Sequence, residues 1–431
     1  MSDAPPPLPS AIEKVAACAG APWAADQLRF TKTIRERAQA LLSRARRGES
    51  AWFSVNDGAM DTAAALVAEL TRARYPDLKI PYHSRWRHFE AGSIHRPGQL
   101  MQKLRKASKE DLARAQIDLA LVAVLLDAGA GPDWTYCEGA VGQRPAQRFS
   151  RSEGLGVASF HAFMAGLFSS DTAQPLQADA EGLKAVTAVL LEKAFQVTPK
   201  NPLVGLEGRA ALLRRLGEAM QAQPEIFGQP ARPGHLFDLL TRGKTSVAAE
   251  DLLAVLLKAL ASIWPAQNAI ENIPLGDCWK HAAAGSNRED SDLTKGWMPF
   301  HKLSQWLTYS LLEPFEWAGI RIEGLDALTG LPEYRNGGLF LDSGVLRLKN
   351  TKLAGRVFDV GDELIVEWRA LTVALLDELA PMVREQLGLT EIQMPLACVL
   401  EGGTWAAGRA LAQQLRHGQP PLNIQSDGTV F

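Results

Sequence analysis

The chain has few of the residues that mark a disulfide framework or a metal site. Only four of its 431 residues are cysteines, and no two of them form a CxxC pair. Widely spaced cysteines are typical of reduced thiols, so we predict a cytoplasmic protein without disulfides. His83, His88 and His95 match no zinc-ligand spacing, and Cys278 with His281 forms only half a motif. The sequence therefore predicts no metal site.

Motifs of several large enzyme classes are also absent. The sequence has no GxxxxGK[ST] P-loop, no Gly-x-Gly after a predicted strand and no GxSxG nucleophile elbow. Its most apolar segment, 117–130, is shorter than a bilayer span and carries two aspartates, and the N-terminus does not resemble a signal peptide. Lys plus Arg (46) nearly balance Asp plus Glu (48), so no net positive field favours nucleic acid. We therefore predict neither a membrane nor a nucleic acid as a partner.

The sequence consists mostly of segments with helical periodicity. Strand-like alternation is confined to 338–348 and 356–366, which predicts one small β-hairpin. We therefore predict a mainly α, compact multi-helix protein with a small β-hairpin. We expect residues 1–10 to form a disordered arm and 11–431 a single helical unit, with a division into 11–200 and 201–431 as the alternative. Helices are predicted at 26–47, 109–127, 153–168, 178–196, 206–221, 248–263, 301–318, 363–386 and 404–417. A further helix is predicted after the cap residues 56–58, through 63 and 67 to 70.

Two segments hold donors suited to an anionic ligand. Arg85 and Arg87 could hold a phosphate while nearby aromatic residues wall a ring-shaped ligand. The same segment also fits a loop whose arginines pair with acidic neighbours while Trp86 and Phe89 fill the core. Ser152 begins a predicted helix, where it is expected to act as the N-cap, and the free amides of that first turn can also bind anions.

The stretch 299–338 places a lysine and a carboxylate on either side of an apolar helix. Lys302 begins that helix beside Trp306 and Tyr309, where its ammonium could hold an anion or have a depressed pKa. An exposed lysine in a first helical turn is the simpler interpretation.

Glu333 follows a proline and precedes Arg335, Asn336 and a pair of glycines, which let a backbone approach a ligand closely. Its simpler interpretation is a carboxylate that favours a helix N-terminus. Further along, Thr404 is predicted to cap a helix, and residues 402–403 could line a pocket. Residues 426–431 are predicted to dock on the body of the protein.

Several segments of the sequence together resemble one protein family. This is the URC-pathway family of uracil catabolism, long described as a domain of unknown function. In that pathway the ring of a uracil nucleotide is opened and urea is released from a ribosyl-urea-type intermediate. The segments that carry the resemblance are 83–90, 125–132, 151–154, 300–338, 366–369 and 400–431.

A second, more distant similarity covers Lys302, 328–335 and 344–346. These residues look like the core of the queuosine-salvage nucleosidases, helical relatives of DNA glycosylases that hydrolyse an N-glycosidic bond. The similarity implies a DNA-glycosylase-like helical core, with 201–431 as its glycosidase-like part. In that family a lysine and an aspartate line the active site, and here the aspartate position is occupied by Glu333.

Together the two similarities imply an N-glycosidase that releases urea and ribose, or ribose phosphate, from a ribosyl-urea substrate. Glu333 would stabilise positive charge on C1′ or act as general base, and Lys302 would hold the substrate or assist the leaving group. Asp342, Glu367 and Asp427 compete for the role of the carboxylate. No metal or organic cofactor is required by this chemistry. The implied substrate contacts are His301, Trp306, Tyr309, Arg335, Asn336, Arg85, Arg87 and Ser152.

The resemblance also implies partners and leaves alternatives open. The expected ligand is a small ribosyl or nucleotide-derived molecule, and association with other uracil-catabolism enzymes is a further expectation. One alternative is a non-catalytic nucleotide-binding or scaffolding protein of the pathway. Another is metal-dependent hydrolysis of the ureido group, for which the sequence offers no coherent ligand set.

Overall fold

The computed structural model describes residues 20–139, 145–264, 268–285 and 293–425. Helices dominate these parts of the chain, and the strands there pair only two at a time. The predicted mainly α fold is therefore confirmed. The predicted arm at 1–10, the tail at 426–431 and Cys18 lie outside the described residues.

Most of the secondary-structure elements are helices. Those of the first half are α1 (Ala21–Gln27), α2 (Thr31–Arg46), α3 (Met60–Arg74), α4 (Arg85–Phe89), α5 (Arg96–Lys103), α6 (Lys109–Leu125), α7 (Arg151–Met164), α8 (Ala180–Ala185), α9 (Ala188–Ala194) and α10 (Leu206–Gln221). Those of the second half are α11 (Pro224–Phe227), α12 (Leu236–Thr241), α13 (Ala249–Ala259), α14 (Lys302–Trp317), α15 (Tyr334–Asp342), α16 (Glu363–Leu387), α17 (Leu396–Val399) and α18 (Trp405–Arg416). A π-helical turn at Leu400–Thr404 joins α17 to α18.

The short strands form isolated pairs. They are β1 (Phe53–Val55) with β10 (Leu346–Leu348), β2 (Thr135–Glu138) with β3 (Gln147–Ser150), β4 (Ser246–Ala248) with β9 (Arg321–Glu323), β5 (Ala269–Ile270) with β6 (Ile273–Pro274), β7 (Cys278–Lys280) with β8 (Trp297–Pro299), and β11 (Val357–Asp359) with β12 (Asn423–Gln425). The pairs β4–β9 and β11–β12 are parallel and the others antiparallel.

The predicted hairpin between 338–348 and 356–366 is wrong. Residues 338–342 belong to α15, and β10 and β11 pair with strands distant in sequence instead of with each other. A short run of alternating residues does not specify the strand with which it pairs, which explains the error.

Most predicted helices are confirmed, but two of them are interrupted. The segment 26–47 breaks at Phe30, which is extended and precedes α2. The segment 178–196 breaks where extended Thr187 caps α9 through its side chain, accepting a hydrogen bond from Leu190 N. β-branched threonine favours an extended cap over a helix interior, because its hydroxyl can bind the exposed amides of the next helix.

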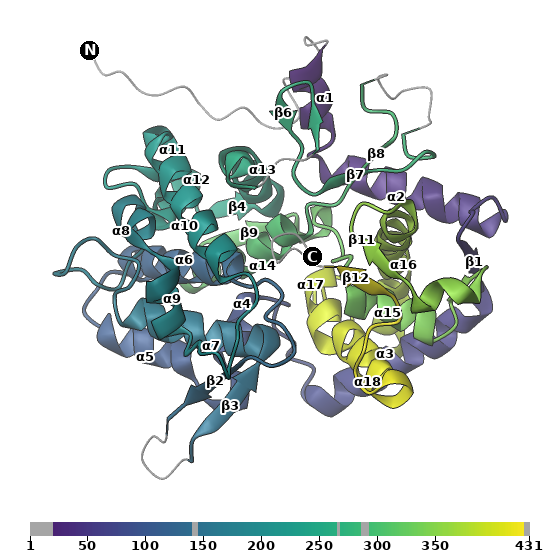
Figure 1. Ribbon diagram of the computed structural model, residues 1–431, viewed down its shortest axis with the longest axis horizontal. Coiled ribbons are helices and arrows are strands. Elements are labelled where there is room, and N and C mark those ends of the chain that lie inside the picture. Colours follow the sequence, from purple (N-terminus) through teal and green to yellow (C-terminus); the bar gives the residue numbers. More distant parts are fainter. Residues whose placement is uncertain (1–19, 140–144, 265–267, 286–292, 426–431) are drawn as a thin grey trace.

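Helices α2 and α3 lie beside the C-terminal helices of the chain. Figure 1 shows α5–α12 on one side of the molecule, and α2, α3 and α15–α18 on the other. α16 packs against both α2 and α3, while α14 packs against α6. One cluster of buried apolar side chains extends from Ile34 to Leu422, so both groups of helices share a core.

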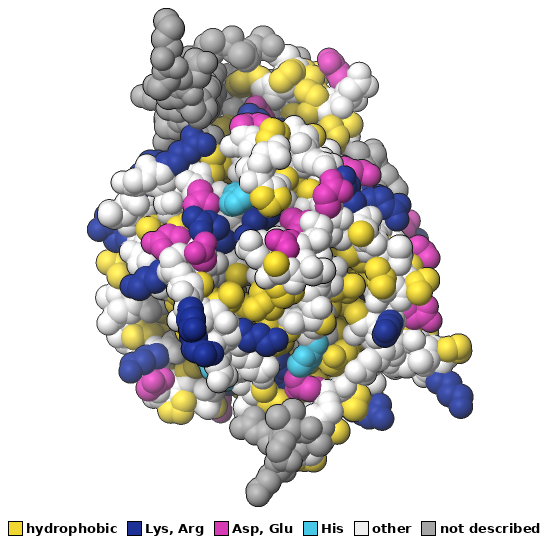
Figure 2. Space-filling view, turned by 90° about the vertical axis from the view of Figure 1, so that its left-hand side faces the viewer, with side chains coloured by type: hydrophobic (Ala, Val, Ile, Leu, Met, Phe, Trp, Pro, Cys, Tyr) yellow, Lys and Arg dark blue, Asp and Glu magenta, His cyan; other side chains and the backbone are white. Residues whose placement is uncertain are grey.

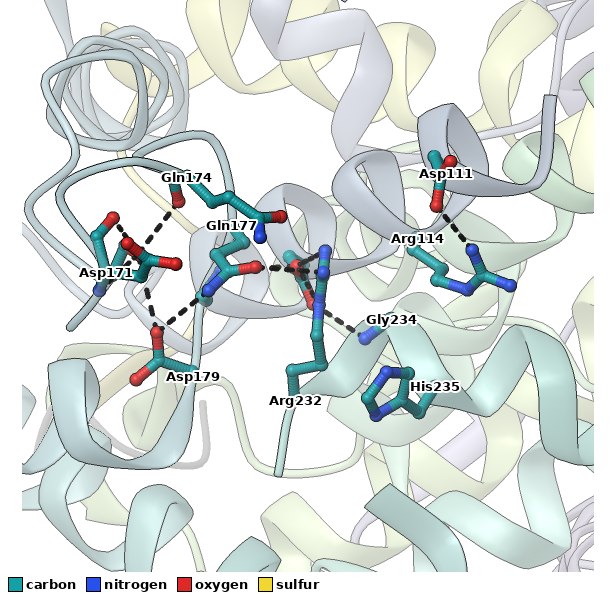
Figure 3. Close-up of polar contacts among 12 residues, drawn as sticks. Asp111, Arg114, Asp171, Gln174, Gln177, Asp179, Arg232, Gly234 and His235 are labelled. Carbon is teal, nitrogen blue, oxygen red and sulfur yellow. Dashed lines mark hydrogen bonds and ion pairs between the residues drawn. The ribbon is translucent and has the colours of Figure 1, made fainter. Parts of the chain in front are cut away.

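A buried polar network attaches the middle helices to α6. Asp118 of α6 accepts hydrogen bonds from Arg232 and from Gly234 N, the latter at 2.6 Å. Arg232 also donates to Gln177 at 3.0 Å, and Gln177 donates to Asp179 at 3.2 Å (Figure 3). Because Asp179 caps α8, this network fixes the α8 and α12 region to the core helix.

The surface carries both signs of charge. On the face shown in Figure 2, basic and acidic side chains are interspersed among apolar ones. The near balance of charge in the composition therefore extends to this face. Among the described residues, no helix combines the length and the apolar character needed to cross a membrane.

Candidate active site

The candidate site is a cavity of ≈ 600 Å³. This volume lies within the range of ordinary small-molecule sites. The walls come from distant parts of the chain: the end of α3, the turn after α6, the N-termini of α7, α14 and α15, and the π-helical turn. Polar residues on the wall are Arg74, Tyr75, His83, Arg87, His88, Glu90, Asp127, Arg151, Ser152, Glu153, Lys302, Glu333, Glu401 and Gln419.

Glu333 is held rigidly at the start of α15. Its Oε2 accepts a hydrogen bond from Arg335 N at 2.7 Å and its Oε1 accepts one from Asn336 N at 2.5 Å. The simpler expectation of a helix N-terminal carboxylate is therefore confirmed, and the same carboxylate lines the cavity. Burial raises the pKa of Glu333, although the two backbone donors and the charge of Lys302 oppose that rise.

Lys302 is the first residue of α14, as predicted, and also lies on the cavity wall. Burial lowers the pKa of its ammonium, while the charge of Glu333 opposes the change. The helix start is anchored by Asp277, whose Oδ2 accepts a hydrogen bond from Lys302 N at 2.9 Å. Asp277 in turn forms a paired contact with Arg369, both distances being 2.8 Å. The lysine and the glutamate predicted from 299–338 thus meet in one cavity.

Another part of the wall is built around Asp127. Asp127 ends the turn after α6 and accepts a hydrogen bond from Arg85 at 2.8 Å. Arg85 is fully buried and donates to Ser152 O at 3.2 Å. It does not line the cavity itself but holds Asp127 and Ser152, which do. Trp306 lines the cavity, and the Arg85 guanidinium lies 5.6 Å from its ring centre.

Ser152 and Arg87 reach the cavity, but the serine is not a cap. The N-cap of α7 is Ser150, and it makes no side-chain capping bond. Arg87 donates to Glu313 at 2.9 Å, so its charge is shared with a buried carboxylate. Burial raises the pKa of Glu313 to about 7, with the positive charge of Arg87 opposing that effect.

Besides Arg85, four further predicted contacts lie outside the cavity lining. Tyr309 is fully buried and donates its hydroxyl to Thr329 O at 3.0 Å. His301 contacts Leu28 O through Nε2 at 2.9 Å, and burial lowers its pKa. Arg335 donates to Gly418 O, and Asn336 to Leu331 O. These side chains support the helices that carry Lys302 and Glu333.

The competing carboxylates occupy other places. Asp342 is paired with Arg416 at 2.5 Å. Glu367 accepts a hydrogen bond from Ser50 and lies 3.0 Å from His281 Nε2, beside a separate cavity of ≈ 180 Å³. Asp427 lies outside the described residues. Among the described residues, no cluster of three or more His, Cys, Asp and Glu side chains is arranged to hold a metal ion.

Sequence reasoning missed Glu401 and treated His83 as structural. Glu401 lies in the π-helical turn and contacts His83, Tyr75 and Arg74. The prediction that Thr404 caps α18 is wrong, because the helical path continues through it from α17. π-Helical turns occur often at functional sites, but their extra residue leaves no periodic signal. The glutamate immediately before two glycines was the available clue.

Comparison with known proteins identifies the family of the chain. Residues 27–431 match the family described as "Protein of unknown function (DUF1688)". The chain belongs to this family. It is 39% identical over 408 residues to "Protein urg3" of Schizosaccharomyces pombe, covering 92% of this chain and 96% of that protein. It is also 39% identical over 412 residues to "Uracil catabolism protein 4" of Lachancea kluyveri, covering 88% and 91% of the two chains. The family predicted from sequence is confirmed, while the similarity to queuosine-salvage nucleosidases stays a prediction.

Proposed function

We propose that this protein acts in uracil catabolism as an N-glycosidase. Its substrate would be a ribosyl-urea, most readily the 5′-phosphate, and its products urea and ribose 5-phosphate. The name of the Lachancea kluyveri relative supports the pathway. The observation that supports the chemistry best is the fixed carboxylate of Glu333 beside Lys302 in one cavity.

Breaking a ribosyl C1′–N bond creates positive charge on the sugar. A carboxylate that is already oriented and shielded from water stabilises such charge without reorganising. Two backbone amides fix the oxygens of Glu333, and its place on the cavity wall, with Lys302 on the same wall, suits it to this role. We therefore assign the stabilisation of the C1′ cation to Glu333.

The phosphate would bind at the basic part of the wall. Lys302, Arg87 and Arg151 line the cavity together with the N-terminus of α7, which begins without a side-chain cap. Exposed amides at a helix start and nearby guanidinium groups both favour an anion. Ser152 adds a hydroxyl at the same place.

The first test is turnover of ribosyl-urea 5′-phosphate by the purified protein, with urea measured by a coupled assay. Glu333→Gln removes the negative charge, so the turnover rate should fall by about 10²-fold or more. Exposed Glu323 lies outside the cavity lining, so Glu323→Gln is the matched control and should retain the wild-type rate.

Two results would contradict the proposal. Wild-type protein that binds the ribosyl compound tightly without releasing urea would instead indicate a non-catalytic binding protein. A Glu333→Gln variant with wild-type turnover would remove this carboxylate from the reaction.

A further inference from the structure

His83 lies on the wall of the candidate active site but has no part in the chemistry described so far. It directly precedes Ser84, the N-cap of α4, and its backbone N–H donates to Ala397 O at 3.0 Å. The imidazole is mostly buried, with 12% of the side chain exposed. Its backbone and ring are therefore fixed at the edge of the space that substrate would occupy.

A carboxylate on the π-helical turn orients the imidazole. Glu401 Oε2 lies 2.8 Å from His83 Nδ1. The other carboxylate oxygen accepts from Tyr75 Oη at 2.9 Å and from Arg74 Nη2 at 2.7 Å. Arg74 also donates to the backbone carbonyls of Glu401 and Gly402, which fastens the turn to the end of α3.

These contacts determine which nitrogen of His83 is held by Glu401. Burial opposes ionisation of Glu401, but His83, Arg74 and Tyr75 outweigh it and leave its pKa below the ordinary value. An ionised carboxylate only accepts hydrogen bonds, so Nδ1 of His83 donates. Nε2 is then the ring nitrogen that is not engaged by Glu401, and it is the one that can exchange a proton with a bound molecule.

The groups around His83 carry both signs of charge. Glu401 and Glu333 are its acidic neighbours, and Arg74 and Arg87 are the basic ones on the same cavity wall. Tyr75 and His88 are uncharged neighbours: burial raises the pKa of Tyr75 and lowers that of His88. Among the described residues, Glu401 is the charged group within hydrogen-bonding distance of the His83 ring.

We propose that His83, oriented by Glu401, is the proton-transfer residue of the cavity. The inference rests on the proposed glycosidase function and deepens it. Protonated His83 donates from Nε2 to the ureido nitrogen as the C1′–N bond breaks and its electron pair moves to that nitrogen. The neutral imidazole then takes a proton from the water whose oxygen bonds to C1′. The reaction balances, and His83 returns to its protonated form.

This assignment separates two roles that sequence analysis combined in Glu333. Both oxygens of Glu333 accept backbone hydrogen bonds, which suits a fixed charge. His83 has one nitrogen held and the other available, which suits proton transfer. Glu401 acts through His83 and is a positioning residue.

The first experiment uses His83→Asn in the full-length protein. The Asn amide can still donate to Glu401 but offers nothing at the place of Nε2. We expect urea release from ribosyl-urea 5′-phosphate to fall by about 10²-fold or more. His95→Asn is the matched control, because His95 is exposed and outside the cavity lining. Calorimetric binding of ribose 5-phosphate to both variants shows that the fold is intact.

A second substrate distinguishes proton donation from a structural role. In 4-nitrophenyl riboside 5′-phosphate the leaving group departs without a proton. His83→Asn should therefore cleave it at a rate within a few-fold of wild type, whereas Glu333→Gln should stay slow. Equal losses on both substrates for His83→Asn, or wild-type urea release, would overturn the role of His83.

Glu401→Gln tests the orienting carboxylate. Its amide oxygen can still accept from Nδ1, but the negative charge that favours the imidazolium is lost. Because the acid form of His83 is needed, the high-pH loss of urea release should move to lower pH in this variant. An unmoved pH profile would contradict the positioning role. Wild-type protein inactive on both substrates would instead refute the glycosidase function, and the proton-transfer role with it.

Discussion

Single residues outside the cavity determine where its charged groups lie, and Asp277 is the clearest case. Its backbone carbonyl accepts hydrogen bonds from Phe300 N and His301 N, its carboxylate accepts one from Lys302 N, and the carboxylate also pairs with Arg369 inside the protein. Burial opposes its ionisation, but the charge and hydrogen bonds of Arg369 outweigh burial and lower its pKa to about 2. The backbone and the carboxylate of one residue therefore align the start of the helix that carries Lys302.

Asp277→Asn should lower the free energy of unfolding by about 3–5 kcal/mol, because the buried guanidinium of Arg369 then loses the negative charge of Asp277. Chemical denaturation at pH 7 measures the change. In the wild type, the folded pKa of Asp277 lies below its unfolded value near 3.9. Its contribution should therefore be present above about pH 4 and fall away toward pH 2. Glu323→Gln, at an exposed pair, should hardly move the denaturation midpoint, and an equal effect of both variants would contradict this account.

At the scale of elements, the close packing of α18 on α15 sets the position of Glu333. A Cβ on Gly408 of α18 would lie 2.0 Å from Arg335 O, inside the first turn of α15. α18 and α15 therefore make their contact at Gly408, next to the first turn of α15, which Glu333 caps.

Gly408→Ala should force α18 away from α15 and lower the free energy of unfolding by about 1–3 kcal/mol. Glycosidase turnover should fall as well, because the start of α15 moves. Gly208→Ala in α10 is the matched control, since a Cβ there meets nothing within 4 Å. That change should raise stability by about 0.5–1 kcal/mol, because alanine favours the helix. Thermal melts of the two variants moving in the same direction would contradict the packing argument.

The elements also show what sequence reasoning could reach. α10, α14 and α16 were predicted within a few residues, because long amphipathic periodicity is a strong local signal. The pairing of β10 with β1 and of β11 with β12 depends on contacts far along the chain, which alternation does not encode. For the site, Lys302 and Glu333 were placed correctly on the cavity wall. Tyr309 and Asn336 were not, because spacing along a helix does not say which face meets the cavity.

At the scale of the whole molecule, one large apolar core extends from Ile34 to Leu422, with a small separate cluster around α1, Ile270 and Trp297. The cavity joins both groups of helices, since its wall includes α3, α7, α14 and α15. Differential scanning calorimetry should therefore give a single unfolding peak. Ribose 5-phosphate at about 100 times its dissociation constant should stabilise the fold by about 2.7 kcal/mol and raise the whole peak. Two peaks, with only one moved by the sugar phosphate, would show that the regions before and after residue 200 unfold separately.

The residues that line the cavity are far apart in the sequence, and this affects when the site can form during synthesis. Arg74 and Gln419 face the same cavity, and β11 is completed by β12 near residue 423. During synthesis the N-terminal helices emerge first. The faces of α2 and α3 that pack against α16 stay uncovered until α16 has been synthesised. A growing chain thus leaves the apolar faces of α2 and α3 exposed until most of the chain has been translated. We expect chaperone binding to nascent chains to persist until α16 emerges, and the cavity of the candidate active site to be among the last features to form.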